Sequence, residues 1–115
     1  MKTTKTHIYH MRPSGKYTFP TYGTQEEKKT WIKKNRVTGY TKVAELTLNS
    51  NNLDVAYTAT QNGLDEQYPS WVALACAYEE NETFVSVNTR STMVGDIIRQ
   101  NDRDYLVDNA GFLEV

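Results

Sequence analysis

RSTMVGDIIRQNDRDYLVDNAGFLEV, residues 90–115, contains the clearest β-sheet pattern of the chain. Apolar and polar side chains alternate here, which predicts two strands, Met93–Gln100 and Asp104–Asp108. The polar residues between them are turn-prone and predict a tight hairpin connection. Gly95 and Gly111 are isolated glycines, typical of turn or bulge positions. We interpret this stretch as the completion of a β-sheet rather than as a functional surface.

Four segments before this stretch are also expected to be strands. Thr6–Met11 and Tyr40–Leu48 alternate polar and apolar side chains, and Thr83–Val87 is rich in β-prone residues. Tyr17–Phe19 predicts a short return strand that ends at Pro20. These segments supply the remaining strands of the expected sheet.

The segment from Thr24 to about Asn35 is predicted to be a surface helix. Thr24 is a favourable N-cap, and Glu27 follows at the spacing of a capping box. Acidic residues lie in its first turn and basic residues lie later, as the helix dipole favours. Because Trp31 and Ile32 are its only apolar residues, we expect this helix to be held to the protein mainly by Trp31.

A second helix is predicted after Asn49 or Ser50, since either residue is a favourable N-cap. Gly63 is placed to end this helix in the left-handed conformation. The apolar run Trp71–Tyr78 fits either a short helix or a buried strand, and periodicity does not separate the two. The face of the second helix that is expected to pack on the sheet carries Leu53, Ala56, Tyr57 and Thr60.

These elements predict a single α+β domain spanning residues 1–115. We expect an antiparallel sheet with about two helices packed on one face and a C-terminal β-hairpin. A chain of 115 residues is long enough to bury a modest core without disulfides. The residues expected to meet in that core are Leu53, Tyr57, Trp71, Ile97, Tyr105 and Phe112.

The net charge of −1 conceals a strong asymmetry along the chain. Residues 1–44 contain ten Lys and Arg against two Glu, whereas residues 45–115 contain three Arg against twelve Asp and Glu. Two outcomes are open. Either the two halves neutralise each other across the fold, or the surface is dipolar and steers a charged partner.

The residue types that carry chemistry are sparse. A single cysteine, Cys76, and the lack of any signal-like or membrane-spanning apolar run predict a cytoplasmic protein. His7 and His10 are three residues apart in a predicted strand, so they point to opposite faces and match no zinc spacing. Ser91 has no nucleophile-elbow motif, and the apolar surroundings of Cys76 are typical of an inert thiol. We therefore expect no enzyme activity, no metal and no cofactor.

Two surfaces are candidates for binding. The first predicted helix carries basic residues near aromatic ones, which suits phosphate contacts and base stacking. The second half carries loop acids beside tyrosines, which suits a basic partner that needs an aromatic anchor. The basic surface comprises Lys28, Lys29, Lys33, Lys34 and Arg36. The partner-binding candidates of the acidic half are Glu79, Glu80, Glu82, Tyr68 and Tyr78.

The C-terminal two-thirds of the chain resembles a group of small uncharacterised phage and plasmid proteins. The resemblance rests on the ending, RSTMVGDII, YLV and GF, and on the strand and helix predicted over residues 43–62. In that group the ending typically reads RSxSVGD, then a tyrosine strand, then Gly-Phe. Met93 stands here where serine is usual. The resemblance covers roughly residues 43–115 and implies a phage or mobile-element setting without catalytic residues.

We therefore expect a non-enzymatic phage or mobile-element accessory protein that binds a host protein or protein–nucleic-acid complex in the host cytoplasm. Its concrete form is an anti-CRISPR-like inhibitor of a host defence complex, since a small protein of lopsided charge suits the masking of a charged surface. The alternative is a small nucleic-acid-binding regulator. Neither interpretation involves a membrane.

Overall fold

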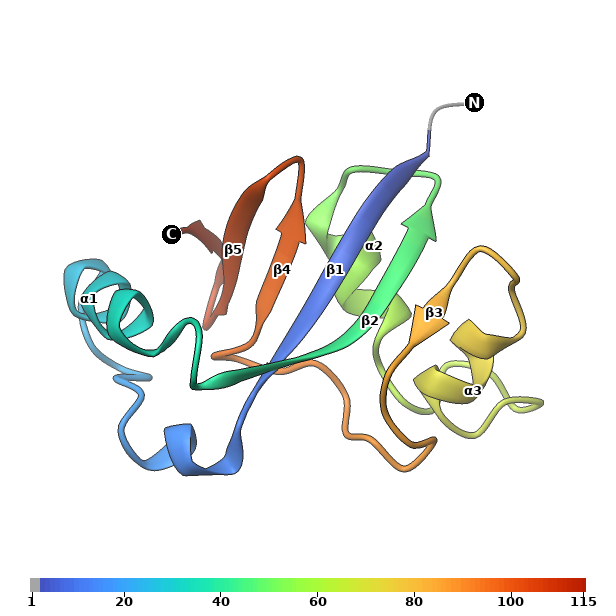
Figure 1. Ribbon diagram of the computed structural model, residues 1–115, viewed down its shortest axis with the longest axis horizontal. Helices are drawn as coiled ribbons and strands as arrows, with labels where there is room; N and C mark the ends of the chain where they lie inside the picture. Colours follow the sequence, from blue (N-terminus) through green and yellow to red (C-terminus); the bar gives the residue numbers. More distant parts are fainter. Residues whose placement is uncertain (1–2) are drawn as a thin grey trace.

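Six strands form one antiparallel sheet in the computed structural model, which describes residues 3–115 (Figure 1). In chain order the strands are β1 (Thr4–Met11), β2 (Tyr40–Leu48), β3 (Glu82–Thr83), β4 (Ile97–Gln100), β5 (Arg103–Asp108) and β6 (Gly111–Glu114). They lie in the order β3-β2-β1-β4-β5-β6, and every neighbouring pair is antiparallel. The predicted α+β class with an antiparallel sheet is confirmed.

The C-terminal part of the sheet is a meander of β4, β5 and β6 joined by two tight turns. Asn101 and Asp102 have φ of +52° and +63°, which gives the twist that a two-residue hairpin needs. Gly111 follows the second turn with φ of +102°, a conformation that glycine adopts without steric cost. The predicted hairpin is confirmed, whereas Gly111 is the first residue of β6 and not a turn residue.

The first strand of this meander is shorter than predicted. It begins at Ile97 rather than Met93, because the Asp96 N–H donates to the Met93 carbonyl at 3.0 Å and closes a turn. Gly95 lies in that turn with φ of +99°, and a Cβ there would lie 2.7 Å from the Met11 side chain. The Met11 methyl is the end of a flexible side chain and can move, so it is the positive φ that makes glycine the favoured residue at position 95.

Two other strand predictions are wrong in extent or type. Tyr17–Phe19 is not extended, because Pro13–Tyr17 forms a 3₁₀ helix, η1, with proline at its start. Of Thr83–Val87, only the first residue belongs to β3. The Phe84 N–H still donates to the Val43 carbonyl at 3.0 Å, after which the chain leaves the sheet edge.

Helix α1 spans Gln25–Asn35 and begins as predicted. The Thr24 hydroxyl accepts the Glu27 N–H at 3.1 Å, and the Glu27 carboxylate accepts the Thr24 N–H at 3.0 Å. These two bonds satisfy N–H groups that the first helical turn leaves without partners. The capping box is confirmed.

Helix α2 spans Leu53–Ala59, and both of its ends differ from the prediction. The sequence predicts Asn49 or Ser50 as its first cap and Gly63 as its last. The N-cap is instead Asn52, whose side chain accepts the Asp54 N–H at 2.9 Å. At the other end, the Thr60 hydroxyl donates to the Ala56 carbonyl at 3.1 Å and satisfies a terminal acceptor of the helix.

Helix α3 spans Trp71–Cys76, so the ambiguous apolar run is a helix. Its N-cap is Ser70, whose hydroxyl accepts the Ala73 N–H at 3.1 Å. None of the helices formed by residues 3–115 is long and apolar enough to cross a membrane.

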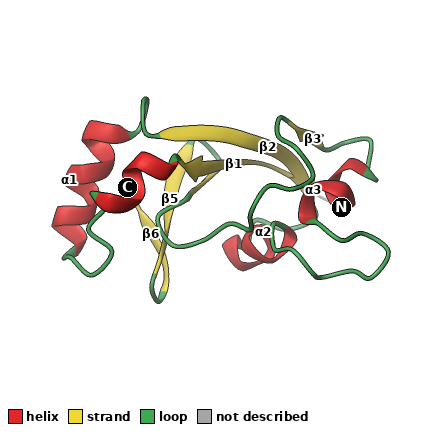
Figure 2. Ribbon diagram, turned by 90° about the horizontal axis from the view of Figure 1, so that it is seen from below, coloured by secondary structure: helices red, strands yellow, loops and turns green. Residues whose placement is uncertain are grey.

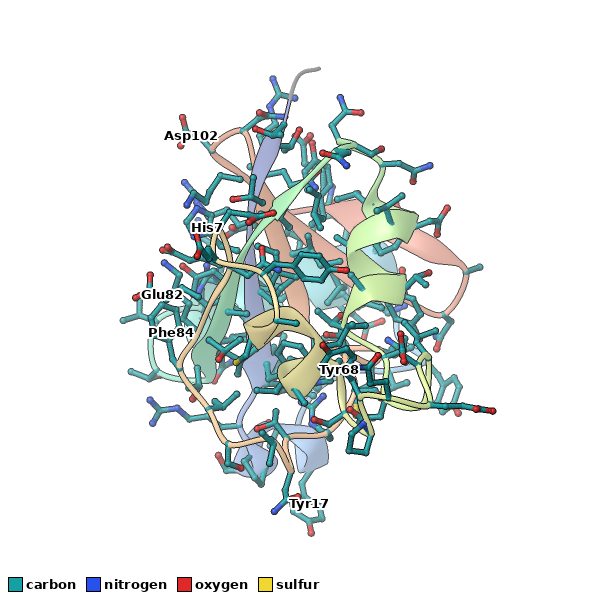
Figure 3. All side chains as sticks on the ribbon, turned by 90° about the vertical axis from the view of Figure 1, so that its right-hand side faces the viewer. His7, Tyr17, Tyr68, Glu82, Phe84 and Asp102 are labelled. Carbon is teal, nitrogen blue, oxygen red and sulfur yellow. The ribbon has the colours of Figure 1, made fainter. Side chains whose placement is uncertain are left out.

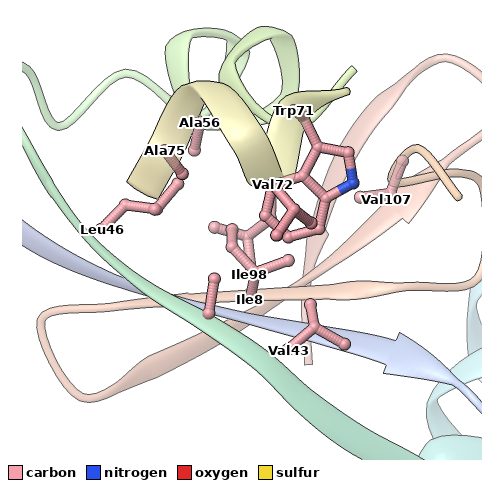
Figure 4. Packing of buried hydrophobic residues seen from close by; sticks show 10 residues of the cluster. Ile8, Val43, Leu46, Ala56, Trp71, Val72, Ala75, Ile98 and Val107 are labelled. Carbon is pink, nitrogen blue, oxygen red and sulfur yellow. The ribbon is translucent and has the colours of Figure 1, made fainter. Parts of the chain in front are cut away.

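Each face of the sheet contributes to a hydrophobic core, because neighbouring residues of its strands point to opposite faces. Ile98 of β4 packs with Ala56 of α2 and Trp71 of α3 (Figure 4). Ile97, on the opposite face of β4, packs with Ile32 of α1. Figure 2 shows α2 and α3 on one side of β1 and β2, with α1 at the far end of the molecule. The two helices that share a face are therefore α2 and α3, and α1 lies on the other face.

The sheet also divides the residues predicted to form a single core. Trp71 is buried in the cluster under α2 and α3, whereas Ile97 is buried in the cluster under α1. Tyr105 is half-buried and lies outside both clusters, so the prediction of one shared core is wrong for Ile97 and Tyr105. The other three predicted residues are half-buried at the margin of the Trp71 cluster: Leu53, Tyr57 and Phe112.

Candidate binding groove

The RSTMVGD motif of residues 90–96 forms a buried ion pair. Arg90 donates two hydrogen bonds, of 2.6 and 2.9 Å, to the fully buried carboxylate of Asp96. The same carboxylate accepts the backbone N–H groups of Met11 at 2.7 Å and of Met93 at 2.8 Å. The motif thus ties the end of β1 to the turn before β4, and its charged groups are used within the fold.

His10 lies against this ion pair. Its Nε2 is 2.9 Å from the Thr92 hydroxyl and 3.9 Å from the Asp96 carboxylate. Burial lowers the pKa of His10 to about 4, with Arg90 acting in the same direction and Asp96 against it. His10 is therefore neutral at pH 7 and is engaged inside the protein.

The two possible nucleophiles have partners that are not bases. The exposed Cys76 sulfur is 3.2 Å from the Thr83 hydroxyl, and the Ser91 hydroxyl accepts the Asn62 N–H at 2.8 Å. Within residues 3–115, no group of three or more His, Cys, Asp or Glu could hold a metal ion. In the described part of the chain, neither the Ser91 hydroxyl nor the Cys76 thiol is hydrogen-bonded to a histidine, and no metal ligand set is assembled.

Two of the five residues predicted to form a basic surface face the sheet. Lys28 is only 6% exposed, and its Nζ donates to the Asp108 carboxylate at 2.6 Å. Arg36 donates to Asp104 at 2.8 Å, and its guanidinium lies 4.1 Å from the centroid of the Tyr9 ring. The three residues that remain exposed are Lys29, Lys33 and Lys34.

These ion pairs lock α1 to β5. Burial acts to raise the pKa of Asp104, but hydrogen bonds from Arg36 and Arg99 outweigh it and lower the pKa. Burial also acts to raise the pKa of Asp108, but hydrogen bonds from Lys28 and from a backbone N–H outweigh it and lower the pKa. Both carboxylates thus stay charged at neutral pH and hold the cations of the helix.

The acidic candidates occupy the loop after α3. Glu79, Glu80 and Glu82 are exposed, and Tyr78 is 52% exposed. In the part of the chain that the structure describes, none of these three carboxylates has a Lys or Arg nitrogen within 4 Å. Tyr68 lies apart from Glu82, in the loop before α3 (Figure 3).

A groove of about 370 Å³ lies between the end of β2, α2 and α3, next to this acidic loop. Tyr78 and Glu80 line it, so the structure brings two of the five acidic-half candidates to one hollow. Val55 of α2 contributes an exposed apolar side chain. The side chains that shape the groove include Leu46, Leu48, Val55, Leu74, Tyr78 and Glu80.

The sequence did not predict the apolar part of this groove. Val55 lies off the helix face that was expected to pack on the sheet, and it is 40% exposed. An apolar residue on the outer side of a short helix was the available signal. Leu48 and Leu74 are far apart in the sequence, so only the packing of α3 beside β2 reveals that they share one hollow.

At the edge of β2 that borders the groove, the Thr47 N–H already has a partner. The Asn81 side chain accepts this N–H at 2.9 Å, and the Thr47 hydroxyl donates to the Glu80 carbonyl at 3.1 Å. The Thr47 N–H is therefore not free to bond a guest strand. The groove therefore presents side chains to a partner.

Glu80 is the one charged residue among the described residues that line the groove. The lining comes from the segment 45–89, which contains seven Asp and Glu and no Lys, Arg or His. Glu80 and the adjacent exposed Glu79 therefore place negative charge at one end of the groove. The arrangement suits a ligand that is cationic and partly apolar.

Comparison with known proteins found no match to this chain among protein-family models, curated proteins or solved structures.

Proposed function

We propose that this chain is a non-enzymatic binding protein whose groove between β2, α2 and α3 receives a basic, partly apolar segment of a partner protein. The observation that carries the proposal is that Leu48, Val55 and Leu74 line one groove with Glu80. In the described part of the chain, neither Glu80 nor the adjacent Glu79 has a Lys or Arg nitrogen within 4 Å. Apolar side chains of the partner would be buried in the groove, and its Lys or Arg would face the acids.

The setting that we propose is a phage or mobile element. The resemblance of residues 43–115 to small phage and plasmid proteins supports it. A host defence complex that binds nucleic acid presents Lys and Arg at its nucleic-acid-binding site. A protein with acidic residues beside an apolar groove is suited to occupy that site. Inhibition of such a complex in the host cytoplasm would then result from occupancy and would need no chemistry from this chain.

The test begins with capture of the partner from bacterial lysate by the tagged chain and continues with association kinetics on the purified partner. We expect Glu79→Lys/Glu80→Lys to slow association, and to do so more at low than at moderate salt, because exposed charges act mainly on encounter. The matched control is Glu26→Lys/Glu114→Lys, which makes the same charge change on α1 and β6.

A second arm tests the apolar part of the groove. Val55→Ala and Tyr78→Ala remove exposed side chains, so we expect faster dissociation with little change in the free energy of unfolding. If both the charge variant and these apolar variants bind as the unmodified chain does, the groove is not the contact surface.

We propose nucleic-acid binding as the alternative function, and it is supported by a different surface. Lys29, Lys33 and Lys34 are exposed on α1, and Tyr17 and Tyr22 are 92% and 94% exposed in the segment before it. Such residues suit phosphate contacts and base stacking. A mobility shift with DNA or RNA alone, weakening steeply with salt, would support this function, and no shift at low salt would remove it.

A further inference from the structure

A second hollow lies on the sheet face opposite α2 and α3, at the end of β1 remote from α1. Figure 3 shows His7 of this region on the side of the sheet away from α2. The hollow has a volume of about 250 Å³. Its lining includes Thr3, Lys5, His7, Arg99, Asn101 and Asp102. It is independent of the groove and of the proposed function.

Strand register brings three basic side chains together here. Lys5 and His7 are two residues apart on β1, so they point to the same face. Arg99 of β4 lies directly opposite His7. Paired residues of antiparallel strands have Cβ atoms only about 5 Å apart. The fold thus brings the N–H donors of Lys5, His7 and Arg99 to one place.

The neighbouring acids do not neutralise these donors fully. Asp104 accepts from Arg99 at 3.0 Å, but it also accepts from Arg36 at 2.8 Å. Asp102 is 3.9 Å from Arg99 and fully exposed, which places it at the rim. In the described part of the chain, Lys5 has no carboxylate within 4 Å.

The pKa of His7 reflects the charges around the hollow. Burial lowers the pKa of His7, and the nearby charges of Lys42, Lys5 and Arg99 lower it further, whereas Glu45 acts in the opposite direction. Its Nδ1 is 3.3 Å from Glu45 but is buried without a hydrogen bond. Of these cations, Lys42 is paired with Glu45 and Arg99 with Asp104, whereas Lys5 has no such partner in the described part of the chain.

We propose that this hollow binds a phosphate group, held by Lys5, His7 and Arg99. All three side chains offer N–H donors, and charge-assisted bonds to phosphate oxygens are among the stronger hydrogen bonds in proteins. The Thr3 hydroxyl and the Asn101 amide add neutral donors to the lining. The volume lies below the roughly 300 Å³ at which pockets for drug-sized ligands begin, so it fits a phosphate rather than a whole large ligand.

Phosphate itself is the probe for the first experiment. Isotope-labelled protein is titrated with inorganic phosphate, while chloride keeps the ionic strength constant, and the His7 ring signals are followed by NMR. We expect saturable shifts at His7, Lys5 and Asn101, and a rise in the pKa of His7 because the bound anion offsets the surrounding cations.

Two variants of matched chemistry decide the outcome. Lys5→Gln removes an exposed charge of the hollow and should weaken phosphate binding about tenfold. Arg12→Gln removes an exposed charge just beyond the opposite end of β1 and should leave the affinity unchanged. Shifts that grow linearly with phosphate, or that are the same in Lys5→Gln, would overturn the proposal and leave only nonspecific screening.

The second arm identifies the source of the phosphate group. A short single-stranded oligothymidylate offers phosphodiesters, whereas inorganic phosphate mimics a free ion or a phosphomonoester. Tighter binding of the oligonucleotide than of phosphate, lost in Lys5→Gln, would assign the hollow to a nucleic-acid backbone. Saturable binding of phosphate that the oligonucleotide does not displace would assign it to a small phosphorylated ligand.

Discussion

Asp96 joins parts of the chain that are distant in sequence. Its carboxylate accepts the N–H of Met11, which is 85 residues away, as well as two hydrogen bonds from Arg90. The neighbouring Gly95 carbonyl accepts the Tyr40 hydroxyl at 2.7 Å, which brings β2 into the same region. At the residue scale, the motif that prompted the family resemblance is thus a structural connection between β1, β2 and β4.

The first prediction concerns this connection. Asp96→Asn replaces one acceptor oxygen by an N–H₂ donor that would face donors from Arg90, Met11 or Met93. Breaking a buried ion pair in this way is expected to lower the free energy of unfolding by about 3–5 kcal/mol. Urea unfolding measures the loss, and Asp54→Asn at an exposed site is the control. A loss no larger than in the control would contradict the structural role.

The second prediction concerns pH and His10. Its pKa is about 4 in the folded protein, against 6.5 for an unperturbed histidine, so the unfolded state takes up a proton first as pH falls. Stability should therefore be independent of His10 above about pH 7 and fall between about pH 6.5 and 4, by roughly 3 kcal/mol in all. Unfolding curves across this range test it, and His10→Gln should remove most of the dependence. An unchanged slope in His10→Gln would contradict the assignment.

At the scale of the elements, α1 is held differently from α2 and α3. The sequence predicts one thin apolar stripe on α1, and the structure adds two ion pairs to β5, Lys28–Asp108 and Arg36–Asp104. Helices α2 and α3 carry no Lys or Arg and pack by apolar contacts with the Trp71 cluster. Ion pairs thus add to the apolar packing of Ile32 and Trp31 in docking α1, whereas hydrophobic burial docks the other two helices.

The third prediction ranks two leucines by burial. Leu53 of α2 is half-buried, whereas Leu46 of β2 is 1% exposed in the same cluster. Leu46→Ala is expected to cost about 3–5 kcal/mol, as fully buried leucines do, and Leu53→Ala about 1–2 kcal/mol because less apolar surface is lost. Urea melts of both variants measure the difference. Equal losses would show that Leu53 is more deeply packed than the structure indicates.

At the scale of the whole molecule, the basic and acidic halves of the chain neutralise each other only in part. Basic residues of the first half neutralise acids of the second where α1 meets β5. The segment 45–89 has no internal cations, and its loop acids Glu79, Glu80 and Glu82 stay without Lys or Arg partners in the described part of the chain. The unneutralised acids therefore gather beside the groove.

The fourth prediction separates the two kinds of lysine on α1. Lys29→Glu/Lys33→Glu/Lys34→Glu changes exposed charges, so the thermal midpoint should shift little. Lys28→Glu places a carboxylate in a buried site against Asp108 and should destabilise the fold strongly, although it changes one charge instead of three. Thermal unfolding of both variants measures this contrast, and a larger loss in the triple variant would contradict it.

Local interactions account for what the sequence predicted well. The capping box of Thr24 and Glu27 and the turn at Asn101 and Asp102 each depend on residues within a few positions of one another, so their sequence patterns are sufficient. Alternation likewise predicted β1 and β2, because the pattern of burial along a strand has a period of two. The acidic loop that borders the groove was also among the predicted candidates.

The sequence by itself therefore determined the α+β class, the first helix cap, the hairpin and the charge of each half of the chain. Only the tertiary structure decided that residues 71–76 form a helix, that α1 lies on the other face from α2 and α3, and that Lys28 is buried. It also assembled the groove from β2, α2 and α3 and the hollow at Lys5, His7 and Arg99. The physical reason is that these features depend on strand register and on packing between residues far apart in sequence, which no local pattern encodes.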